Sequence, residues 1–310
     1  MYFSILPHIV LINGRNKSAL FDVEEGAYVH VPQEIYRCLV KRTIPVSDLN
    51  IDEEWKSFML ENGFAIETDF IPDFGSIDNF DFDIPFDYET LVIDANVVSD
   101  ALRYIQAMPN ERLSRYTQVR IFDNVHSRKL ETIIELLNSK SIYNIELVFN
   151  WSKNDSEENL KKMLDKYNYC LSKLIVMGYK DITYNNRLFF NKKRLTDSSQ
   201  CGICNENLLS INVETYNKFL LGNTCLWKKI AIDINGNVKN CPSMDFDYGS
   251  VFNIDLKDVK NNPRYHFFSL LRKNEISDCK DCEFRVFCVD CRCKCTNEIY
   301  DKPNTCDYNP

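Results

Sequence analysis

The distribution of cysteine constrains this chain more than any other feature of its sequence. Thirteen of the 310 residues are cysteine, eleven of them lie at or after Cys201, and seven lie between Cys279 and Cys306. A chain that keeps its thiols reduced uses such density for metal binding rather than for disulfides. None of the four histidines lies inside the dense cluster. The sequence therefore predicts an all-thiolate metal site in the C-terminal third.

Composition and charge narrow the class of protein. Hydrophobic residues make up 45% and charged residues 26%, which is typical of a globular chain of two or three domains. The net charge of -8 argues against nucleic acid as a partner, because such binding uses clustered Lys and Arg. No apolar run reaches the length of a membrane span, and the start of the chain lacks the basic segment of a signal peptide. We therefore expect a cytoplasmic protein that binds neither nucleic acid nor membrane.

Residues 1–68 are predicted to form a small α+β module. Short apolar strands are expected first, and the last of them, Ala27–Val31, ends at Pro32. Pro32 suits the first turn of a helix that carries Ile35 and Leu39 on one face. Three strands followed by helices resemble the winged-helix module that binds leader peptides in peptide-maturation proteins. The alternative is that these residues only cap the neighbouring domain.

In leader-binding modules an incoming peptide adds a strand beside such a segment and packs side chains against the helix that follows. Strand addition uses main-chain hydrogen bonds for affinity and side-chain pockets for specificity. The resemblance therefore implies a precursor peptide as a partner. The residues that would contact it are Ala27, Tyr28, Val29, Ile35 and Leu39.

Residues 69–87 are predicted to be an acidic, phenylalanine-rich linker. Its phenylalanines alternate loosely with aspartates, and Pro72 and Pro85 discourage regular structure. We expect the phenylalanines to hold the linker against a neighbouring domain, with a role in recognition as the alternative.

Strands and helices are predicted to alternate over residues 88–200. Buried strands are expected at Leu91–Ala95, Val119–Phe122, Ile145–Phe149 and Lys173–Met177, with amphipathic helices between them. This alternation implies parallel βαβ units, and four such units amount to half of a (βα)8 barrel. The predicted fold class is therefore α/β, with a partial (βα) barrel.

Residues 201–310 differ from the rest because short polar segments and cysteines dominate. We expect bound metal, rather than a large core, to hold this segment together. Cys225 and Cys241 flank Asn235-Gly236, a hairpin signal that would bring the two thiols towards one point.

Two Cys-x-x-Cys loops follow, Cys279–Cys282 and Cys288–Cys291. Such a loop lets two sulfurs reach one metal centre. Iron–sulfur clusters take four thiolates, commonly from such loops with a distant fourth ligand, whereas structural zinc also accepts two pairs of this kind. Iron–sulfur clusters and zinc are therefore both compatible with the spacing.

These spacings resemble the SPASM domain. Cys225, ten residues, Gly236, four residues and Cys241 follow the first half of its pattern, and Cys279, Cys282 and Cys288 with two later cysteines follow the second. One departure is that two residues, not three, separate Cys288 from Cys291. Several short stretches are similar to the grasp-with-spasm family of peptide maturases, namely Asn240-Cys-Pro-Ser-Met244, Cys288-Val-Asp-Cys-Arg292 and Lys302-Pro-Asn-Thr-Cys-Asp-Tyr-Asn309.

The resemblance implies two auxiliary [4Fe-4S] clusters bound by residues 201–310. Ligands of the first cluster would be Cys225, Cys241 and Cys291. Ligands of the second would be Cys279, Cys282, Cys288 and Cys306. The fourth ligand of the first cluster stays open between Cys201, Cys204 and Cys293, or that iron has no protein ligand.

The resemblance also implies a barrel of radical SAM type before the SPASM domain, and two partners, an ATP-grasp peptide ligase and a short precursor peptide. Radical SAM enzymes bind their catalytic cluster with Cys-x3-Cys-x2-Cys after the first barrel strand. The corresponding segment, Ile93–Asp100, contains no cysteine, so we do not expect S-adenosylmethionine as a cofactor and assign no catalytic residue. The predicted function is maturation of a ribosomally made peptide. The alternatives are a non-catalytic adaptor and a zinc-stapled interaction protein.

Overall fold

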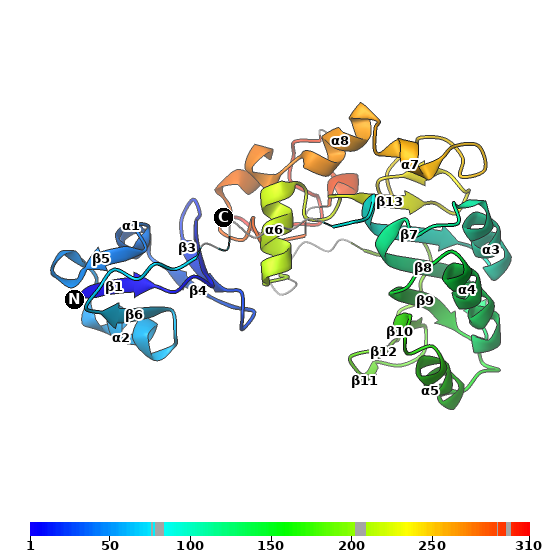
Figure 1. Cartoon of the computed structure of the whole chain (residues 1–310), viewed down its shortest axis with the longest axis horizontal. Helices are drawn as coiled ribbons and strands as arrows, with labels where there is room; N and C mark the ends of the chain where they lie inside the picture. Colours follow the sequence, from blue (N-terminus) through cyan, green and yellow to red (C-terminus); the bar gives the residue numbers. More distant parts are fainter. Residues whose placement is uncertain (76, 78–83, 202–208, 290, 296–298) are drawn as a thin grey trace. The chain divides into compact units, whose positions relative to one another are not determined.

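The protein is represented by a computed structural model (Figure 1) that describes residues 1–75, 77, 84–201, 209–289, 291–295 and 299–310, except for the side chain of Lys294. The chain divides into two compact units. The first comprises Met1–Phe82, Gly202–Cys225 and Leu271–Pro310, and the second comprises Asp83–Cys201 and Leu226–Leu270. The segment after residue 201, which the sequence analysis treats as one domain, therefore contributes to both units.

The N-terminal part of the first unit holds two antiparallel three-stranded sheets and two helices. One sheet has the order β5-β1-β6, formed by Thr43–Pro45, Tyr2–Ile5 and Ala65–Thr68. The other has the order β2-β3-β4, formed by Ile9–Asn13, Ser18–Asp22 and Ala27–Val31. The helices are α1 (Gln33–Leu39) and α2 (Glu53–Glu61), with a short 3-10 helix at Val46–Asp48 between them.

Local signals explain the ends of both helices. Pro32 precedes α1 at its N-cap position, as its fixed φ favours. The side chain of Asp52 accepts a hydrogen bond from the Trp55 N–H and so caps the start of α2. Gly63 follows α2 with φ at +70°, a conformation that glycine adopts at low cost. The predicted helix with Ile35 and Leu39 is therefore present as α1.

The hairpin of β2 and β3 packs on both of its faces. Ile9 and Leu20 belong to a core that also contains residues of α1 and α2. Val10 and Phe21 point to the opposite face, where they join a second core with Phe219, Phe284 and Phe287. Phe219 lies on α6 (Val213–Leu221). Both faces of the hairpin are thus buried within the first unit.

The second unit contains an eight-stranded sheet with the order β11-β12-β10-β9-β8-β7-β13-β14. Its strands, in chain order from β7 to β14, are Tyr88–Ala95, Ser114–Val125, Ile145–Trp151, Leu171–Met177, Ile182–Asn185, Leu188–Asn191, Lys229–Ile232 and Val238–Lys239. Strands β7 to β10 pair in parallel, as predicted. Only β11 and β14 are antiparallel to their neighbours.

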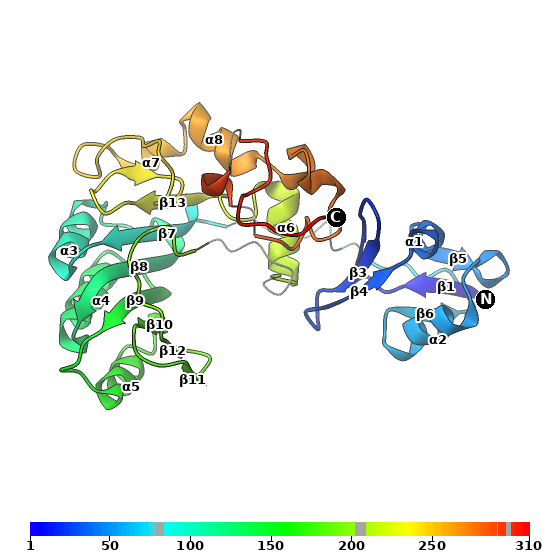
Figure 2. The same ribbon diagram turned by 180° about the vertical axis from the view of Figure 1, so that it is seen from behind.

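Three amphipathic helices lie on the same side of this sheet (Figure 1 and Figure 2). They are α3 (Val98–Ala107), α4 (Ser127–Ser139) and α5 (Glu157–Lys166). Their buried faces and the strands form one large apolar core. The last helix ends at Lys166, and Leu171 begins β10 a few residues later. The second unit is therefore a mixed α/β structure with a mostly parallel sheet, as expected.

The hairpin predicted at Asn235-Gly236 is present, but its strands are joined by a longer loop than expected and it also pairs with another strand. The connection is a loop rather than a two-residue turn: the Asp233 N–H bonds to the Asn237 carbonyl, and the Asp233 carboxylate accepts from the N–H groups of Asn235 and Asn237. Gly236 has the expected positive φ, at +80°. Strand β13 pairs in parallel with β7, because Ile230 and its neighbours are apolar enough to be buried in that sheet. The hairpin thus extends the α/β sheet.

The remaining helices of the described residues are short. They are α7 (Leu256–Val259), α8 (Pro263–Leu270) and three 3-10 helices, η4 (Lys273–Glu275), η5 (Cys279–Asp281) and η6 (Arg292–Lys294). Over the described part of the chain, no helix combines the length and the apolar character that crossing a membrane requires.

Two phenylalanines in the described part of the linker pack against other side chains, whereas Phe70 is exposed. Phe74 lines a groove of the first unit with Leu11 and Tyr36, and the Phe86 ring lies 4.3 Å from the Arg112 guanidinium. Phe80 and Phe82, part of the same prediction, lie outside the described residues.

Candidate metal centre

A cavity of the first unit is lined by four cysteines, Cys279, Cys282, Cys288 and Cys306. They are the set that the resemblance assigns to the second cluster. Three tight turns bring them there: the Cys282 N–H bonds to the Cys279 carbonyl at 3.1 Å, the Cys288 N–H to the Phe284 carbonyl at 3.0 Å, and the Cys306 N–H to the Pro303 carbonyl at 3.0 Å. Segments distant in sequence therefore present their thiols to one space.

Three cationic side chains line the same cavity, Lys273, Arg285 and Lys302. A main-chain carbonyl holds each of them: Lys273 Nζ donates to Val289 at 3.3 Å, and Lys302 Nζ donates to Tyr308 at 3.1 Å. Arg285 donates to the Cys282 carbonyl at 2.8 Å, and burial lowers its pKa. The positive charge of Lys273 acts to lower the pKa of the Cys282 thiol and so to favour its thiolate form.

The cavity is poorly solvated around Cys282. Burial raises the pKa of its thiol to about 12. Without metal the group is therefore a neutral thiol at pH 7, and metal binding must displace its proton.

The fit of a cluster to this cavity rests on its donor set. Four soft thiols line one space, and four thiolates are the ligand set of a [4Fe-4S] cluster. Within the described ranges, no three His, Cys, Asp or Glu side chains are grouped so as to hold a single metal ion. A four-iron cluster does not require such grouping, because each thiolate binds a separate iron.

A buried carboxylate stands directly beside the cavity. Glu283 is 1% exposed, its Oε1 lies 3.3 Å from His30 Nε2, and it also accepts from the Tyr308 hydroxyl. A Cβ at Gly14 would lie 2.7 Å from Glu283 Oε2 and 2.5 Å from the Lys17 carbonyl, so only glycine fits at this turn. No local pattern in the sequence predicts this group of contacts around Glu283, because the residues lie far apart in the chain.

The N-terminal hairpin is also tied to the cysteine-rich segment by charge. Arg15 forms an ion pair with Asp281 at 3.1 Å, and its N–H donates to the Asp281 carbonyl at 2.7 Å. Arg285 donates to the Asn13 carbonyl at 2.6 Å. The cysteine cavity is therefore supported by the β2–β3 turn.

The residues assigned to the first cluster are divided between the units. Cys225 and Cys291 belong to the first unit and Cys241 to the second. Cys241 is buried in a turn, where its carbonyl accepts from the Met244 N–H. Their role as ligands stays a prediction.

The three cysteines considered as a fourth ligand have different positions. Cys293 Sγ lies 3.2 Å from Cys291 Sγ. Cys201 belongs to the second unit, and its thiol lies 3.6 Å from the Ser198 carbonyl. Cys204 lies outside the described residues.

The residues assigned to peptide binding lie on and beside the edge strand β4. Ala27 is exposed, whereas the Tyr28 ring packs edge-on against Phe284 with centroids 5.2 Å apart. Val29 packs against the N-terminal core, and Ile35 and Leu39 are buried within it, at 7% and 0% exposure. Ile35 and Leu39 are therefore core residues, so that peptide capture, which stays a prediction, would use the main-chain edge of β4.

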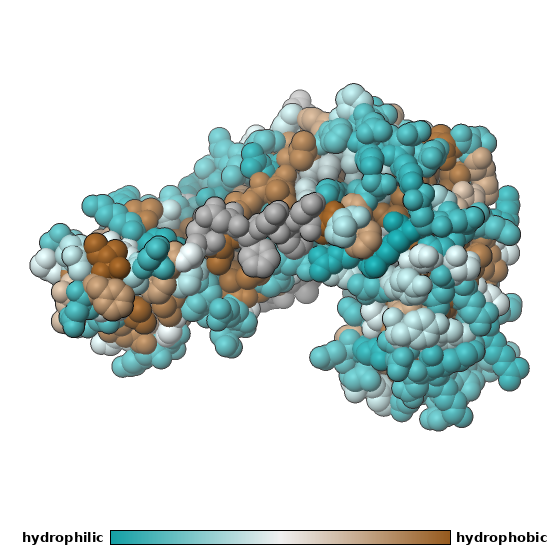
Figure 3. All heavy atoms as spheres, viewed as in Figure 1, coloured by the Kyte–Doolittle hydropathy of each residue, from teal (hydrophilic) through white to brown (hydrophobic). Residues whose placement is uncertain are grey.

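The N-terminal module and the start of the linker that follows it expose several apolar side chains. Met1, Val40, Phe70 and Ile71 are each more than half exposed. In Figure 3 apolar residues show on the module, whereas the region around α5 and β11 of the second unit is mainly hydrophilic. This distribution favours the module over α5 and β11 as a surface for apolar contacts.

Comparison with known proteins identifies one domain. Residues 224–283, which include Cys225, Cys241, Cys279 and Cys282, match the family model of SPASM, an iron-sulfur cluster-binding domain. The chain therefore contains a domain of the kind that binds iron–sulfur clusters. No curated protein sequence matches the chain.

Two solved structures are similar at a low level. A crystal structure of BtrN in an open conformation aligns with 63% of this chain and 92% of its own, at a TM-score of 0.33 and 8% identity. A crystal structure of Streptococcus suis SuiB bound to S-adenosylmethionine aligns with 98% of this chain and 100% of its own, at a TM-score of 0.34 and 13% identity. TM-scores this low do not establish a common fold.

Proposed function

We propose that this protein takes part in the maturation of a ribosomally made peptide and carries two [4Fe-4S] clusters. Its partners would be the precursor peptide and an ATP-grasp ligase that joins side chains of that peptide into rings. The observation that carries the proposal is the cavity lined by Cys279, Cys282, Cys288 and Cys306, in a chain with a SPASM match at residues 224–283. The precursor peptide and the ligase come from the motif resemblance.

The residues of the cavity have separable roles. The four cysteines would hold the second cluster, which when bound supplies one-electron transfer. Lys273, Arg285 and Lys302 offset the negative charge of four thiolates in a buried place. Glu283 and the β2–β3 turn hold the Cys279–Cys288 segment in position.

Metal analysis tests the cluster proposal. Protein purified without oxygen should contain iron and acid-labile sulfide in nearly equal amounts. Cys282→Ala should remove about half of the iron and leave the other cluster, and Cys225→Ala should do the reverse, because the two ligand sets are distinct. Cys38→Ala is the matched control, since this thiol lies on α1 and donates to the Asn50 carbonyl, outside both predicted sets. Stoichiometric zinc without sulfide would instead support a zinc-stapled interaction protein.

Hydrogen–deuterium exchange tests peptide capture. A peptide that adds to β4 should protect the amides of residues 27–31 in the full-length protein, because strand addition forms main-chain hydrogen bonds. Strand β11, an edge strand of the other unit, should show no change and is the internal control. Binding of the precursor with protection elsewhere would move the peptide site away from β4.

A non-catalytic adaptor is the second candidate, and one observation favours it. Strand β7 ends at Ala95 and α3 begins at Val98, so the loop that would carry a catalytic cluster has two residues and no cysteine. An adaptor would accelerate ring formation by the ligase without a product of its own. A new modification of the precursor that needs this protein but not the ligase would identify an enzyme.

A further inference from the structure

The two edges of the eight-stranded sheet differ in how the chain covers them. At one edge lies β14, and the segment that follows it bonds to its outer side. The Val238 N–H bonds to the Gly249 carbonyl at 2.9 Å, and the Tyr248 N–H bonds to the Val238 carbonyl at 2.8 Å. At the other edge lies β11 (Figure 1), and among the described residues only β12 pairs with the main chain of Ile182–Asn185. The outer main-chain groups of β11 are therefore available to another strand.

Strand β11 is exposed but ordered. All four of its residues are exposed, Ile182 by 43% and Tyr184 by 42%. The Asn185 side chain accepts from the N–H groups of Arg187 at 2.8 Å and Leu188 at 2.9 Å, which fixes the turn into β12. An edge that is already extended loses little conformational entropy when it gains a partner strand.

A group of aromatic and charged side chains lies between β11 and α5. Glu157 of α5 accepts from the Tyr179 hydroxyl at 3.1 Å, and it also accepts from the Tyr184 hydroxyl and from Lys180 Nζ. One turn further along α5, Lys161 Nζ lies 4.4 Å from the centre of the Tyr184 ring. Rings and a cation held in fixed positions beside an edge strand can contact the side chains of a strand that adds there.

The charge around β11 is opposite in sign to the charge of the whole chain. Residues 179–194 contain five cationic side chains and one acidic side chain, hence a net charge of +4, whereas the chain carries -8. The acidic one, Asp181, forms an ion pair with Lys192 at 3.5 Å and accepts from the Lys192 N–H. Lys193 and Arg194 are exposed, and neither forms an ion pair within the described part of the chain. This surface therefore favours a partner that is acidic.

We propose that β11 is a docking edge for an acidic, extended segment of a partner protein, which adds to the sheet as a further strand. Main-chain hydrogen bonds to β11 hold the segment, and Lys161, Lys193 and Arg194 select acidic side chains. The region around α5 and β11 is mainly hydrophilic (Figure 3), which fits a charged partner better than an apolar one. The inference is independent of the proposed function, because the peptide edge at β4 lies in the other unit.

Binding of labelled strand peptides to the full-length protein tests the proposal. A peptide of alternating aspartate and valine should bind in fluorescence anisotropy, and more weakly as the salt concentration rises. The same peptide with lysine in place of aspartate should not bind. A peptide of alternating aspartate and proline should also fail to bind, because it keeps the charge but lacks N–H groups that strand pairing uses.

Charge reversal and hydrogen exchange locate the site. Lys161→Glu together with Lys193→Glu should weaken binding of the aspartate–valine peptide roughly tenfold. Arg128→Glu together with Lys129→Glu is the matched control, because it makes the same charge change at exposed positions of α4, and it should leave binding nearly unchanged. The bound peptide should protect the amides of residues 182–185 and not those of residues 27–31, the edge strand of the other unit.

Several outcomes would overturn the proposal. Equal binding of the valine and proline peptides would exclude strand addition, and equal effects of the two charge reversals would exclude β11 as the site. Tighter binding of a single-stranded oligonucleotide, with protection of residues 182–185, would identify a general polyanion site instead. Failure of the aspartate–valine peptide to bind, with self-association of the Lys161→Glu and Lys193→Glu protein, would mean that these cations only keep copies of the chain from pairing at their edges.

Discussion

Asp155 connects the starts of two helices through one carboxylate. It accepts from the Ser127 N–H at 2.5 Å at the start of α4, and from the Ser156 N–H at 2.8 Å and Asn159 Nδ2 at 3.0 Å at the start of α5. Burial acts to raise its pKa, but these hydrogen bonds outweigh burial and lower the pKa below its ordinary value. The ionised form is therefore the one that stabilises the fold.

We expect Asp155→Asn to lower the free energy of unfolding by about 1–2 kcal/mol at pH 7, because charge-assisted hydrogen bonds at two helix starts are weakened. Because the pKa of Asp155 is lower in the folded than in the unfolded state, its ionised carboxylate stabilises the fold fully above the unfolded-state pKa of about 4. This stabilisation is lost as the pH falls through the folded-state pKa. The difference in unfolding free energy between wild type and Asp155→Asn should therefore become smaller as the pH is lowered. Urea denaturation over a series of pH values measures it.

The control for this measurement is Glu158→Gln. Glu158 lies in the first turn of α5 but is mostly exposed, and it forms a surface ion pair with Lys162. Its replacement should change the unfolding free energy by less than about 0.5 kcal/mol. Equal effects of the two substitutions, or a difference that grows on acidification, would contradict the role given to Asp155.

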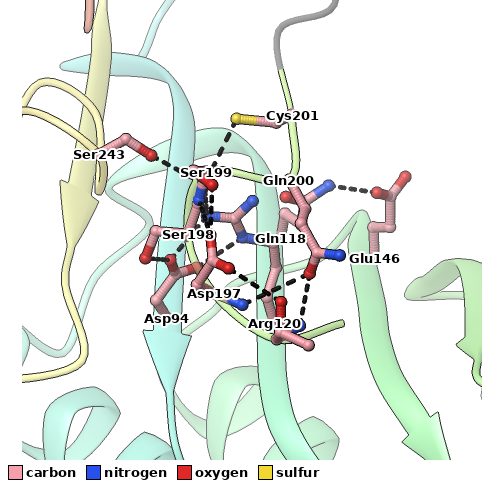
Figure 4. A network of polar contacts seen from close by, with 11 residues as sticks. Asp94, Gln118, Arg120, Glu146, Asp197, Ser198, Ser199, Gln200, Cys201 and Ser243 are labelled. Atoms are coloured by element: carbon pink, nitrogen blue, oxygen red, sulfur yellow. Dashed lines mark hydrogen bonds and ion pairs between the residues drawn. The ribbon is translucent and has the colours of Figure 1, made fainter. Parts of the chain in front are cut away.

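At the scale of elements, the junction of β7 and α3 decides which chemistry the parallel sheet can support. Ligands of open α/β sheets bind at the carboxyl ends of the strands. Here only Asn96 and Val97 connect strand and helix, which is too short for a loop that wraps a cluster. At the carboxyl ends of β9 and β7, polar side chains already bond to the segment that follows β12. Asn150 donates to the Leu195 carbonyl at 2.8 Å, and Ser198 donates to Asp94 (Figure 4).

The expected result is that the protein, with a strong reductant and S-adenosylmethionine, releases no 5′-deoxyadenosine. Chromatography of the reaction mixture measures this product, and a radical SAM enzyme with an intact motif is the positive control. Release over many turnovers would show that other cysteines support this reaction and that the β7–α3 junction is not decisive.

At the scale of the whole molecule, the cysteine cavity and the large apolar core belong to different compact units. Phe284, Val286 and Phe287 lie between two cavity cysteines and join the second core of the first unit. The core of the second unit is formed by strands β7 to β10 and helices α3 to α5. Metal should therefore stabilise the two units unequally.

Removal of iron with a chelator under oxidising conditions should speed amide hydrogen exchange in residues 279–288 and in β2 and β3. Without metal the cavity segment loses its attachment, and the apolar residues that it supplies to the hairpin become exposed. Exchange in β8 and β9 should hardly change. A uniform increase over both units would mean that the chain unfolds as one cooperative body.

Much of the fold is readable from local patterns in the sequence. Apolar runs such as Leu91–Ala95 and Ile145–Phe149 lie in parallel strands as predicted, because burial on both faces of a sheet leaves a continuous apolar run. The tight turn expected of Cys279–Cys282 is present, whereas the grouping of Cys279, Cys282 and Cys288 with Cys306 in one cavity was implied by the motif resemblance and not by spacing. The apolar runs and this turn depend on residues close together in the chain.

Only the tertiary structure decided which surfaces meet. The apolar residues of Lys229–Ile232 indicate a buried strand but not the strand beside which it lies. Its place beside β7 depends on residues far away in the sequence. The spacing of Ile35 on its helix is compatible with a residue of a binding groove and with a residue of the core. Its side chain is buried in one cluster with Leu20 of β3, so it is a core residue. The contacts of Glu283 with His30 and of Arg120 with Ser198 have no local signal for the same reason. The periodicity of apolar residues indicates that a side chain is buried, whereas the tertiary structure determines which residues it contacts.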